Sequence, residues 1–165
     1  MRRSTLKTVM DTFIGSPQLG FALFFVAVWL AVSFLLSYIS GWAFVAEHYR
    51  SKRPFAGRYE RIPSSQMGPL GPFGGARNAL YVGVDSEALH LRMFFLFRVN
   101  CRDLSIPWRD ITVTRGKSFF MNYMEFHFRQ APKIAVRIYG KAGEVIRTLA
   151  GSAWPSEMAP DPVRA

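Results

Sequence analysis

The stretch GFALFFVAVWLAVSFLLSYISGWAFVA, Gly20–Ala46, is 27 residues long and carries no charge. About 20 apolar residues span the hydrocarbon core of a bilayer as a helix, in which every backbone polar group is satisfied internally. A serine–proline pair just before the stretch fits the cap and first turn of a helix. We therefore expect one transmembrane helix over residues 17–46, with Tyr38 and Trp42 at the membrane interface near its C-terminal end.

Two other interpretations of this stretch are open. A buried helix of a soluble core would need a larger protein around it than 165 residues provide. A cleavable signal peptide would use Arg2, Arg3 and Lys7 as its basic region, but the apolar stretch is long for one and no clear cleavage site follows. Residues 1–16 form a tail whose apolar residues recur at helical spacing, which fits a short helix lying in the interface.

Basic residues on either side of the span indicate its orientation. The N-terminal flank carries three. The C-terminal flank carries five: Arg50, Lys52, Arg53, Arg58 and Arg61. The flank with more basic residues tends to stay in the cytoplasm. Cys101 is the only cysteine, so the chain can form no internal disulfide, which suits a reducing compartment. The sequence therefore predicts a cytoplasmic C-terminal domain.

Residues 47–76 join the anchor to that domain. They combine the basic juxtamembrane stretch with a segment rich in glycine and proline, which we interpret as a linker that can also supply a first strand. The net charge of the chain is +10. The five basic residues of the C-terminal flank are candidate contacts for anionic lipid headgroups, with a plain topology signal as the alternative interpretation.

From residue 77 onward, apolar residues alternate with period two, which is typical of half-buried strands. The alternation predicts one shared core of six residues: Leu89, Leu91, Phe126, Phe128, Val136 and Ile138. A short helix ending at Gly151 follows, and its spacing predicts that Val145 and Leu149 cap this core. We expect residues 77–151 to form an antiparallel six- to seven-stranded small barrel or sandwich with a C-terminal helix, followed by a flexible tail over residues 152–165.

Three motifs carry a resemblance to a known group of proteins. They are GWAFVAEHYR after the anchor, YVGVDSEALHLR, and LFRVNC followed by IPWRDI, of which IPWRDI (Ile106–Ile111) is the most specific. Together with the order of elements they resemble uncharacterised bacterial single-pass membrane proteins that carry a pleckstrin-homology-like (GRAM-like) domain. The resemblance implies that fold and a bacterial inner membrane, but no activity, because a fold does not establish a function.

No catalytic or metal-binding constellation is recognisable. The three histidines are isolated, and His90 and His127 fall on outward strand positions. Asp103 and Asp110 are expected to pair with the arginine that precedes each of them. Cys101 has no base partner in the sequence. We therefore expect no enzyme activity, no cofactor, no metal and no nucleic-acid binding.

Two apolar features are candidate surfaces. MFFLF, Met93–Phe97, lies between two arginines. It fits a buried strand entering a bend, which we favour, or a segment that dips into the membrane interface. Phe119, Met121 and Tyr123 fall on the face opposite the core residues of their strand, which predicts an exposed stripe for a protein partner or the bilayer.

These observations favour a non-enzymatic, membrane-tethered binding or scaffold module. Its ligand would be a protein partner, anionic lipid headgroups, or both. The alternative is a structural accessory subunit whose helix packs within a larger membrane complex.

The orientation gives the first testable prediction. A reporter that works only in the cytoplasm should be active when fused after Ala165, because the C-terminal flank holds the excess of basic residues. Efficient activity of a reporter that works only outside the cytoplasm, fused at the same residue, would reverse the assigned topology.

Overall fold

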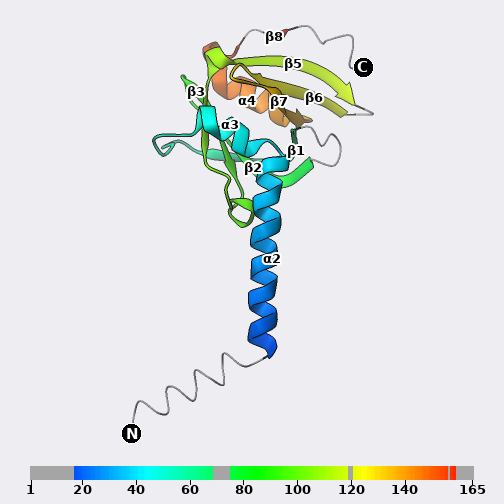
Figure 1. Ribbon diagram of the computed structural model, residues 1–165. Helices are drawn as coiled ribbons and strands as arrows, with labels where there is room; N and C mark the ends of the chain where they lie inside the picture. Colours follow the sequence, from blue (N-terminus) through cyan, green and yellow to red (C-terminus); the bar gives the residue numbers. More distant parts are fainter. Residues whose placement is uncertain (1–16, 69–74, 119–120, 156, 159–165) are drawn as a thin grey trace.

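The protein consists of one long apolar helix that carries a β-rich domain at its C-terminal end (Figure 1). The computed structural model describes residues 17–68, 75–118, 121–155 and 157–158. The long helix, α2, spans Pro17–Ile39 and has a mean hydropathy of 2.6 in its most apolar window, of which only 6% is buried. Among the described residues it is the one helix long and apolar enough to cross a membrane, and its exposure argues against the core helix of a soluble protein.

Helix α2 ends earlier than the uncharged stretch does, so the expectation of one helix over residues 17–46 is wrong. The chain turns at Ser40 and Gly41, and a second helix, α3, spans Trp42–Tyr49. Gly41 has a φ of 78°, a left-handed conformation that residues with a Cβ rarely adopt. The turn at this glycine directs α3 away from the axis of α2 and into the domain.

Helix α3 is part of the domain core. Trp42, Val45 and Tyr49 are buried there at 0–3% exposure. The indole Nε1 of Trp42 donates a hydrogen bond to the carbonyl oxygen of Arg102 at 2.8 Å. Trp42 therefore does not lie at the membrane interface as expected. Its apolar surface meets protein instead of lipid.

The strands form one sheet, which bends into two layers around this core. The strands are β1 (Tyr59–Met67), β2 (Gly75–Val84), β3 (Ala88–Met93), β4 (Leu104–Pro107), β5 (Ile111–Ser118), β6 (Met121–Phe128), β7 (Ala131–Tyr139) and β8 (Glu157–Met158). After α3 the chain forms one further α-helix, α4 (Ala142–Ala150), and three short 3-10 turns, η2 (Phe95–Phe97), η3 (Trp108–Asp110) and η4 (Gly151–Ala153).

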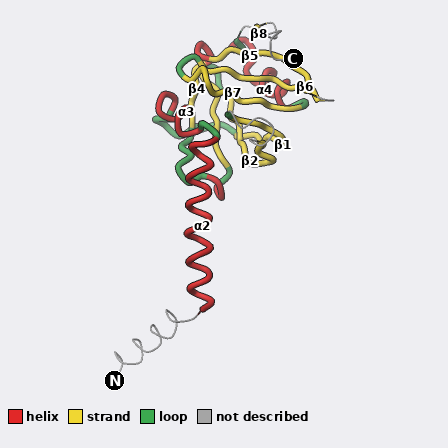
Figure 2. The backbone as a smooth tube through the Cα atoms, turned by 45° about the vertical axis from the view of Figure 1, so that its right-hand side comes forward, coloured by secondary structure: helices red, strands yellow, loops and turns green. Residues whose placement is uncertain are grey.

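The strand order is β4-β3-β2-β1-β7-β6-β5-β8. Strands β1 to β7 are antiparallel to their neighbours, and the two-residue β8 runs parallel to β5. Only three residue pairs join β1 to β7, and there the sheet bends so that β1–β3 and β5–β7 lie as two layers (Figures 1 and 2). The sheet is not closed into a barrel. The antiparallel sheet with a C-terminal helix confirms the predicted fold class.

All six predicted core residues are buried, each with an exposed fraction of 1% or less. The predicted cap is wrong, however, because Val145 and Leu149 are 49% and 56% exposed. Helix α4 instead turns Gly143, Ile146 and Ala150 toward the core. A Cβ added at Gly143 would lie 2.7 Å from the sulfur of Met124, so the helix approaches β6 too closely for a larger residue there. The face of α4 that packs inward therefore combines one large apolar residue, Ile146, with the small residues Gly143 and Ala150, which allow the close approach.

The domain extends beyond the expected core of residues 77–151 at both ends. Toward the N-terminus it includes α3, most of which was expected to belong to the transmembrane helix, and β1, the first strand that the linker was expected to be able to supply. Toward the C-terminus, Trp154 packs against Trp108 and Phe126 at ring-centroid distances of 6.1 and 5.9 Å. The side chain of Arg115 donates hydrogen bonds to both carboxylate oxygens of Glu157. The described part of the segment 152–165 is thus attached to the domain; residues 1–16 and 159–165 lie outside the described residues.

Helix α4 gives a matched pair of variants. Ile146→Asp should unfold the domain or lower its free energy of unfolding by at least about 3 kcal/mol, because the side chain is 2% exposed and the new carboxylate would be buried without a partner. Leu149→Asp, three residues away and 56% exposed, should change it by no more than about 0.5 kcal/mol. Thermal and denaturant unfolding of the full chain in detergent measures both. Equal damage from the two variants would show that α4 packs with a different face.

Candidate functional site

Helix α2 joins the domain through a packed junction. A Cβ added at Gly68, at the end of β1, would lie 2.2 Å from the carbonyl oxygen of Ser40. A Cβ added at Gly41 would lie 2.4 Å from the side chain of Ile134 in β7. Both glycines therefore permit contacts that a larger residue would prevent. The end of α2 is held between two strands, which fixes the direction in which the helix leaves the domain.

The connection between β3 and β4 packs beside the C-terminal part of α2 (Figures 1 and 2). The side-chain amide of Asn100 in this connection donates a hydrogen bond to the hydroxyl oxygen of Ser37 at 2.8 Å. Ser33 and Ser37, one turn apart on α2, are buried at 3% and 1% exposure. A hollow below this contact is lined by Phe34 of α2 together with Phe95 and Arg98 of the connection. This side of the domain is therefore the side that α2 would hold against a bilayer.

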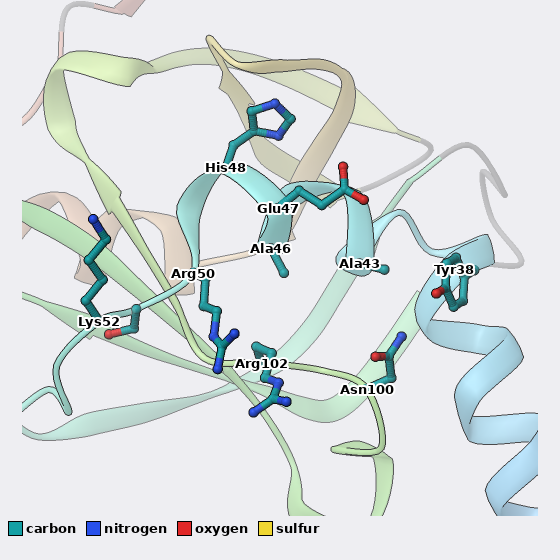
Figure 3. A pocket seen from close by; sticks show the side chains of 10 residues that line it. Tyr38, Ala43, Ala46, Glu47, His48, Arg50, Lys52, Asn100 and Arg102 are labelled. Carbon is teal, nitrogen blue, oxygen red and sulfur yellow. The ribbon is translucent and has the colours of Figure 1, made fainter.

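A second hollow opens at the end of α2, beneath α3 (Figure 3). Its lining residues include Tyr38, Asn100, one acidic residue, Glu47, and three basic residues, Arg50, Lys52 and Arg102. The three basic side chains are exposed and form no ion pair with any described residue. We call this the basic hollow. Three unpaired cations against one carboxylate, that of Glu47, give the recess a net positive charge, which is suited to binding an anion.

Backbone contacts place these cations. Arg50 forms an antiparallel bridge with Leu104, and the N–H of Ser51 donates to the carbonyl oxygen of Asp103 at 2.8 Å. The start of the segment that the sequence suggested as a linker is thereby held against the edge strand β4. This pairing brings Arg50 to Arg102, although 51 residues separate them in the chain.

The five predicted lipid contacts do not form a single cluster. Arg50, Lys52 and Arg53 line a neighbouring hollow together, but only Arg50 and Lys52 also line the basic hollow. Arg58 pairs with Glu60 at 3.0 Å, and its side chain is 87% exposed. Arg61 lies at the base of the β3–β4 connection. Sequence reasoning missed Arg102 as a member of the hollow, because nothing local in the chain signals that β4 lies beside α3.

The predicted apolar stripe lies elsewhere. Met121 is 54% exposed, and Tyr123 is half-buried between Tyr139 and the guanidinium of Arg137. Phe119 lies outside the described residues. Strand β6 belongs to the layer on the far side of the domain from α2 (Figure 1). The stripe and the basic hollow are therefore separate surfaces.

The segment Met93–Phe97 is not the buried strand that the sequence favoured. Strand β3 ends at Met93, and the next residues form the turn η2, with Phe95, Leu96 and Phe97 exposed by 69%, 42% and 43%. These side chains are exposed because the β3–β4 connection that holds the turn extends beside α2 and not over the core (Figure 1). Three consecutive large apolar residues thus lie on the surface.

The acidic residues make structural contacts, though with other partners than expected. Asp103 accepts hydrogen bonds from Arg92 and Arg98, each at 2.9 Å, and not from the preceding Arg102. Asp110 likewise accepts from the side chain of Gln130 at 3.3 Å. The contacts of Asp103 hold the base of the β3–β4 connection, whereas the contact of Asp110 joins η3 to the β6–β7 turn.

His90 is buried at 7% exposure, which contradicts its predicted outward position. Its Nε2 lies 2.7 Å from a carboxylate oxygen of Asp85, and its ring stacks on Phe55 at 4.2 Å. Partial burial of Asp85 raises the pKa of its carboxyl group. The hydrogen bonds with His90 and from the N–H groups of Glu87 and Ala88 lower this pKa by more, so it lies below its usual range. The contact between Asp85 and His90 stabilises the β2–β3 turn.

Chemically reactive groups are scarce in the described part of the chain. Burial raises the pKa of the Cys101 thiol to about 11, which keeps it protonated and unreactive near neutral pH. The described residues contain no group of three His, Cys, Asp or Glu side chains placed to hold a metal ion. Comparison with protein-family models, curated proteins and solved structures finds no match to this chain.

The packed junction can be tested with two glycine variants. Gly68 and Gly140 both have positive φ, 79° and 71°, so alanine strains the backbone at either position. Only at Gly68 would the new Cβ also meet a backbone carbonyl; at Gly140 nothing lies within 4 Å. Gly140→Ala should cost about 1 kcal/mol of unfolding free energy and Gly68→Ala clearly more, measured by unfolding of the full chain in detergent. Equal losses would mean that the junction is loose.

Proposed function

We propose that this protein is a non-enzymatic, membrane-anchored binding module. Helix α2 spans the bilayer, the domain lies on the cytoplasmic face, and the basic hollow binds anionic lipid headgroups. The observation that carries this proposal is the position of Arg50, Lys52 and Arg102 at the end of an apolar helix of membrane-spanning length. All three are exposed and have no ion-pair partner among the residues that the structure describes.

The magnitudes suit recruitment of lipid by an anchored protein. Each basic residue near an anionic surface contributes roughly 1 kcal/mol, so three contribute at most about 3 kcal/mol, which repulsion from the Glu47 carboxylate in the same hollow reduces. That corresponds to an enrichment of about 100-fold at most, because each 1.4 kcal/mol is a factor of ten. Such an interaction is weak for a soluble protein. It is sufficient here because α2 already keeps the domain at the surface.

Retention of α2 in the mature protein is supported by the junction. The hydrogen bond from Asn100 to Ser37 and the contact of Gly68 with Ser40 belong to the packing of the domain. Removal of the helix as a signal peptide would expose this side of the domain. The excess of basic residues after the helix supports the cytoplasmic orientation.

A protein partner is the second candidate ligand, and one observation favours it. A hollow on the layer remote from α2 is lined by Met121, Tyr123, Lys117, Lys141 and Glu144. It combines an exposed apolar side chain with charges of both signs, and in the proposed orientation it faces away from the bilayer. A scaffold would present such a surface to a cytoplasmic protein.

Lipid selectivity of the full chain tests the headgroup proposal. Protein in nanodiscs that contain both phosphatidylserine and phosphatidylcholine is released for native mass spectrometry, and the lipids retained by it are counted. Arg50→Gln with Arg102→Gln should reduce the preference for phosphatidylserine by roughly tenfold or more, since two cations near the headgroups are lost. High salt should weaken the preference of the parent protein.

The matched control carries Lys117→Gln and Lys141→Gln, which remove the same charge from the remote hollow. It should retain the preference of the parent. If both double variants lose selectivity equally, net charge alone is responsible. If neither loses it, the basic hollow is not a headgroup site, and the remote hollow becomes the better candidate for ligand binding.

A further inference from the structure

We propose that the turn η2, Phe95–Phe97, inserts into the membrane interface as a second contact beside α2. The inference rests on the anchor in the proposed function, but it is independent of headgroup selectivity. Its consequence is that the protein meets the bilayer at two points, a spanning helix and an interfacial turn, so that the domain is held in one orientation on the surface.

The first observation is the exposure of the turn. Phe95, Leu96 and Phe97 are consecutive and all exposed, Phe95 by 69%. The described β2–β3 turn, in contrast, presents the polar residues Asp85 and Ser86 to solvent. A contiguous apolar patch of this kind marks a contact surface.

The second observation identifies the bilayer as the occupant. Phe95 and Phe34 line the same hollow, and Phe34 belongs to α2. With a rise of about 1.5 Å per residue, Phe34 lies about 7–8 Å before the helix end at Ile39. The 23 residues of α2 are about 35 Å long, against a hydrocarbon core of about 30 Å. A bilayer that covers α2 therefore reaches the level of this turn.

The third observation is the charge around the turn. The guanidinium of Arg61 lies 5.6 Å from the ring centroid of Phe94. Arg98, directly after the turn, is half exposed and held by Asp103 at 2.9 Å. Apolar side chains at the tip with arginines at the base are the arrangement of interfacial segments, in which the rings enter the boundary and the cations stay at the headgroups.

The turn is also formed in advance. The N–H of Phe94 donates to the carbonyl oxygen of Ala79 at 2.7 Å, and the N–H of Phe97 donates to that of Phe94 at 2.9 Å. The rings of Phe94 and Phe95 pack at 4.6 Å. Insertion would therefore not require a new backbone conformation, which lowers the entropy that binding costs.

Depth-dependent quenching tests this proposal on the full chain. Leu96→Cys places a fluorescent label at the tip, and Met121→Cys places the same label on the remote layer at similar exposure, 42% against 54% for the native side chains. The buried Cys101 should not compete for the label, and the parent chain reports any background labelling. Each labelled protein is reconstituted in phosphatidylcholine vesicles, with the domain outside.

The label at residue 96 should be quenched by lipids that carry a nitroxide on the upper acyl chain, and should be at least about threefold less accessible to aqueous iodide than the label at residue 121. The double variant Phe95→Ser with Phe97→Ser should lose this protection but keep the thermal midpoint of the parent in detergent, because both side chains are exposed. Use of a zwitterionic lipid separates insertion from headgroup selectivity.

Three outcomes would overturn the proposal. Equal access of iodide to both labels, in protein that floats with the vesicles, would leave the anchor but exclude insertion. Protection of residue 96 from both iodide and the nitroxide lipids would indicate that a second copy or another protein covers the turn. Failure of the protein to float with the vesicles would remove the anchor itself. Absence of a phosphatidylserine preference in the parent protein, with quenching at residue 96 as expected, would contradict only the headgroup proposal.

Discussion

The burial of α3 immediately after α2 constrains the rest of the structure. Trp42 follows the end of α2 by only three residues and is fully buried, and removing such a side chain from a core typically costs about 3–5 kcal/mol. Since α3 cannot shift without exposing it, core packing fixes the direction of α2. The close approaches at Gly41 and Gly68 reinforce that direction. The same face of the domain, with the basic hollow and the turn η2, must therefore always lie beside the helix.

The sequence was sufficient to predict the sheet. In a half-buried strand, parity decides which side chains face the core, so Leu91 and Phe126 could be placed without knowing the topology. Parity failed for His90, which is buried on the other face of β3 because it stacks on Phe55 and pairs with Asp85. The C-terminal end of α2 could not be predicted from the absence of charge, because an uncharged stretch has the same composition whether it contacts lipid or a protein core. Ser40-Gly41 was the available signal, since a glycine commonly ends a helix. In α4, Ile146 packs inward beside Gly143, whose close fit against Met124 turns Val145 and Leu149 outward, and helical spacing does not report such a fit.

The candidate site was only partly predictable, because it depends on contacts between distant segments. Arg50 was a candidate on the basis of local charge, but its partner in the hollow, Arg102, is brought there by the pairing of Arg50 with Leu104. The composition of Met93–Phe97 could not distinguish burial from exposure. The contact of Asn100 with Ser37, 63 residues apart, places that segment beside α2. The pleckstrin-homology-like resemblance stays a prediction, and the proposed function rests on the arrangement of these residues alone.

A rigid connection between α2 and the domain is the central claim, and a distance measurement tests it most directly. Spin labels at Leu30 in α2 and at Met121 in the remote layer, both exposed positions, report the relative placement of the two parts by pulsed electron paramagnetic resonance in nanodiscs. The packed junction predicts one narrow distance distribution, unchanged by the lipid composition. A broad or multimodal distribution would show that the domain moves freely about the helix end, which contradicts the account.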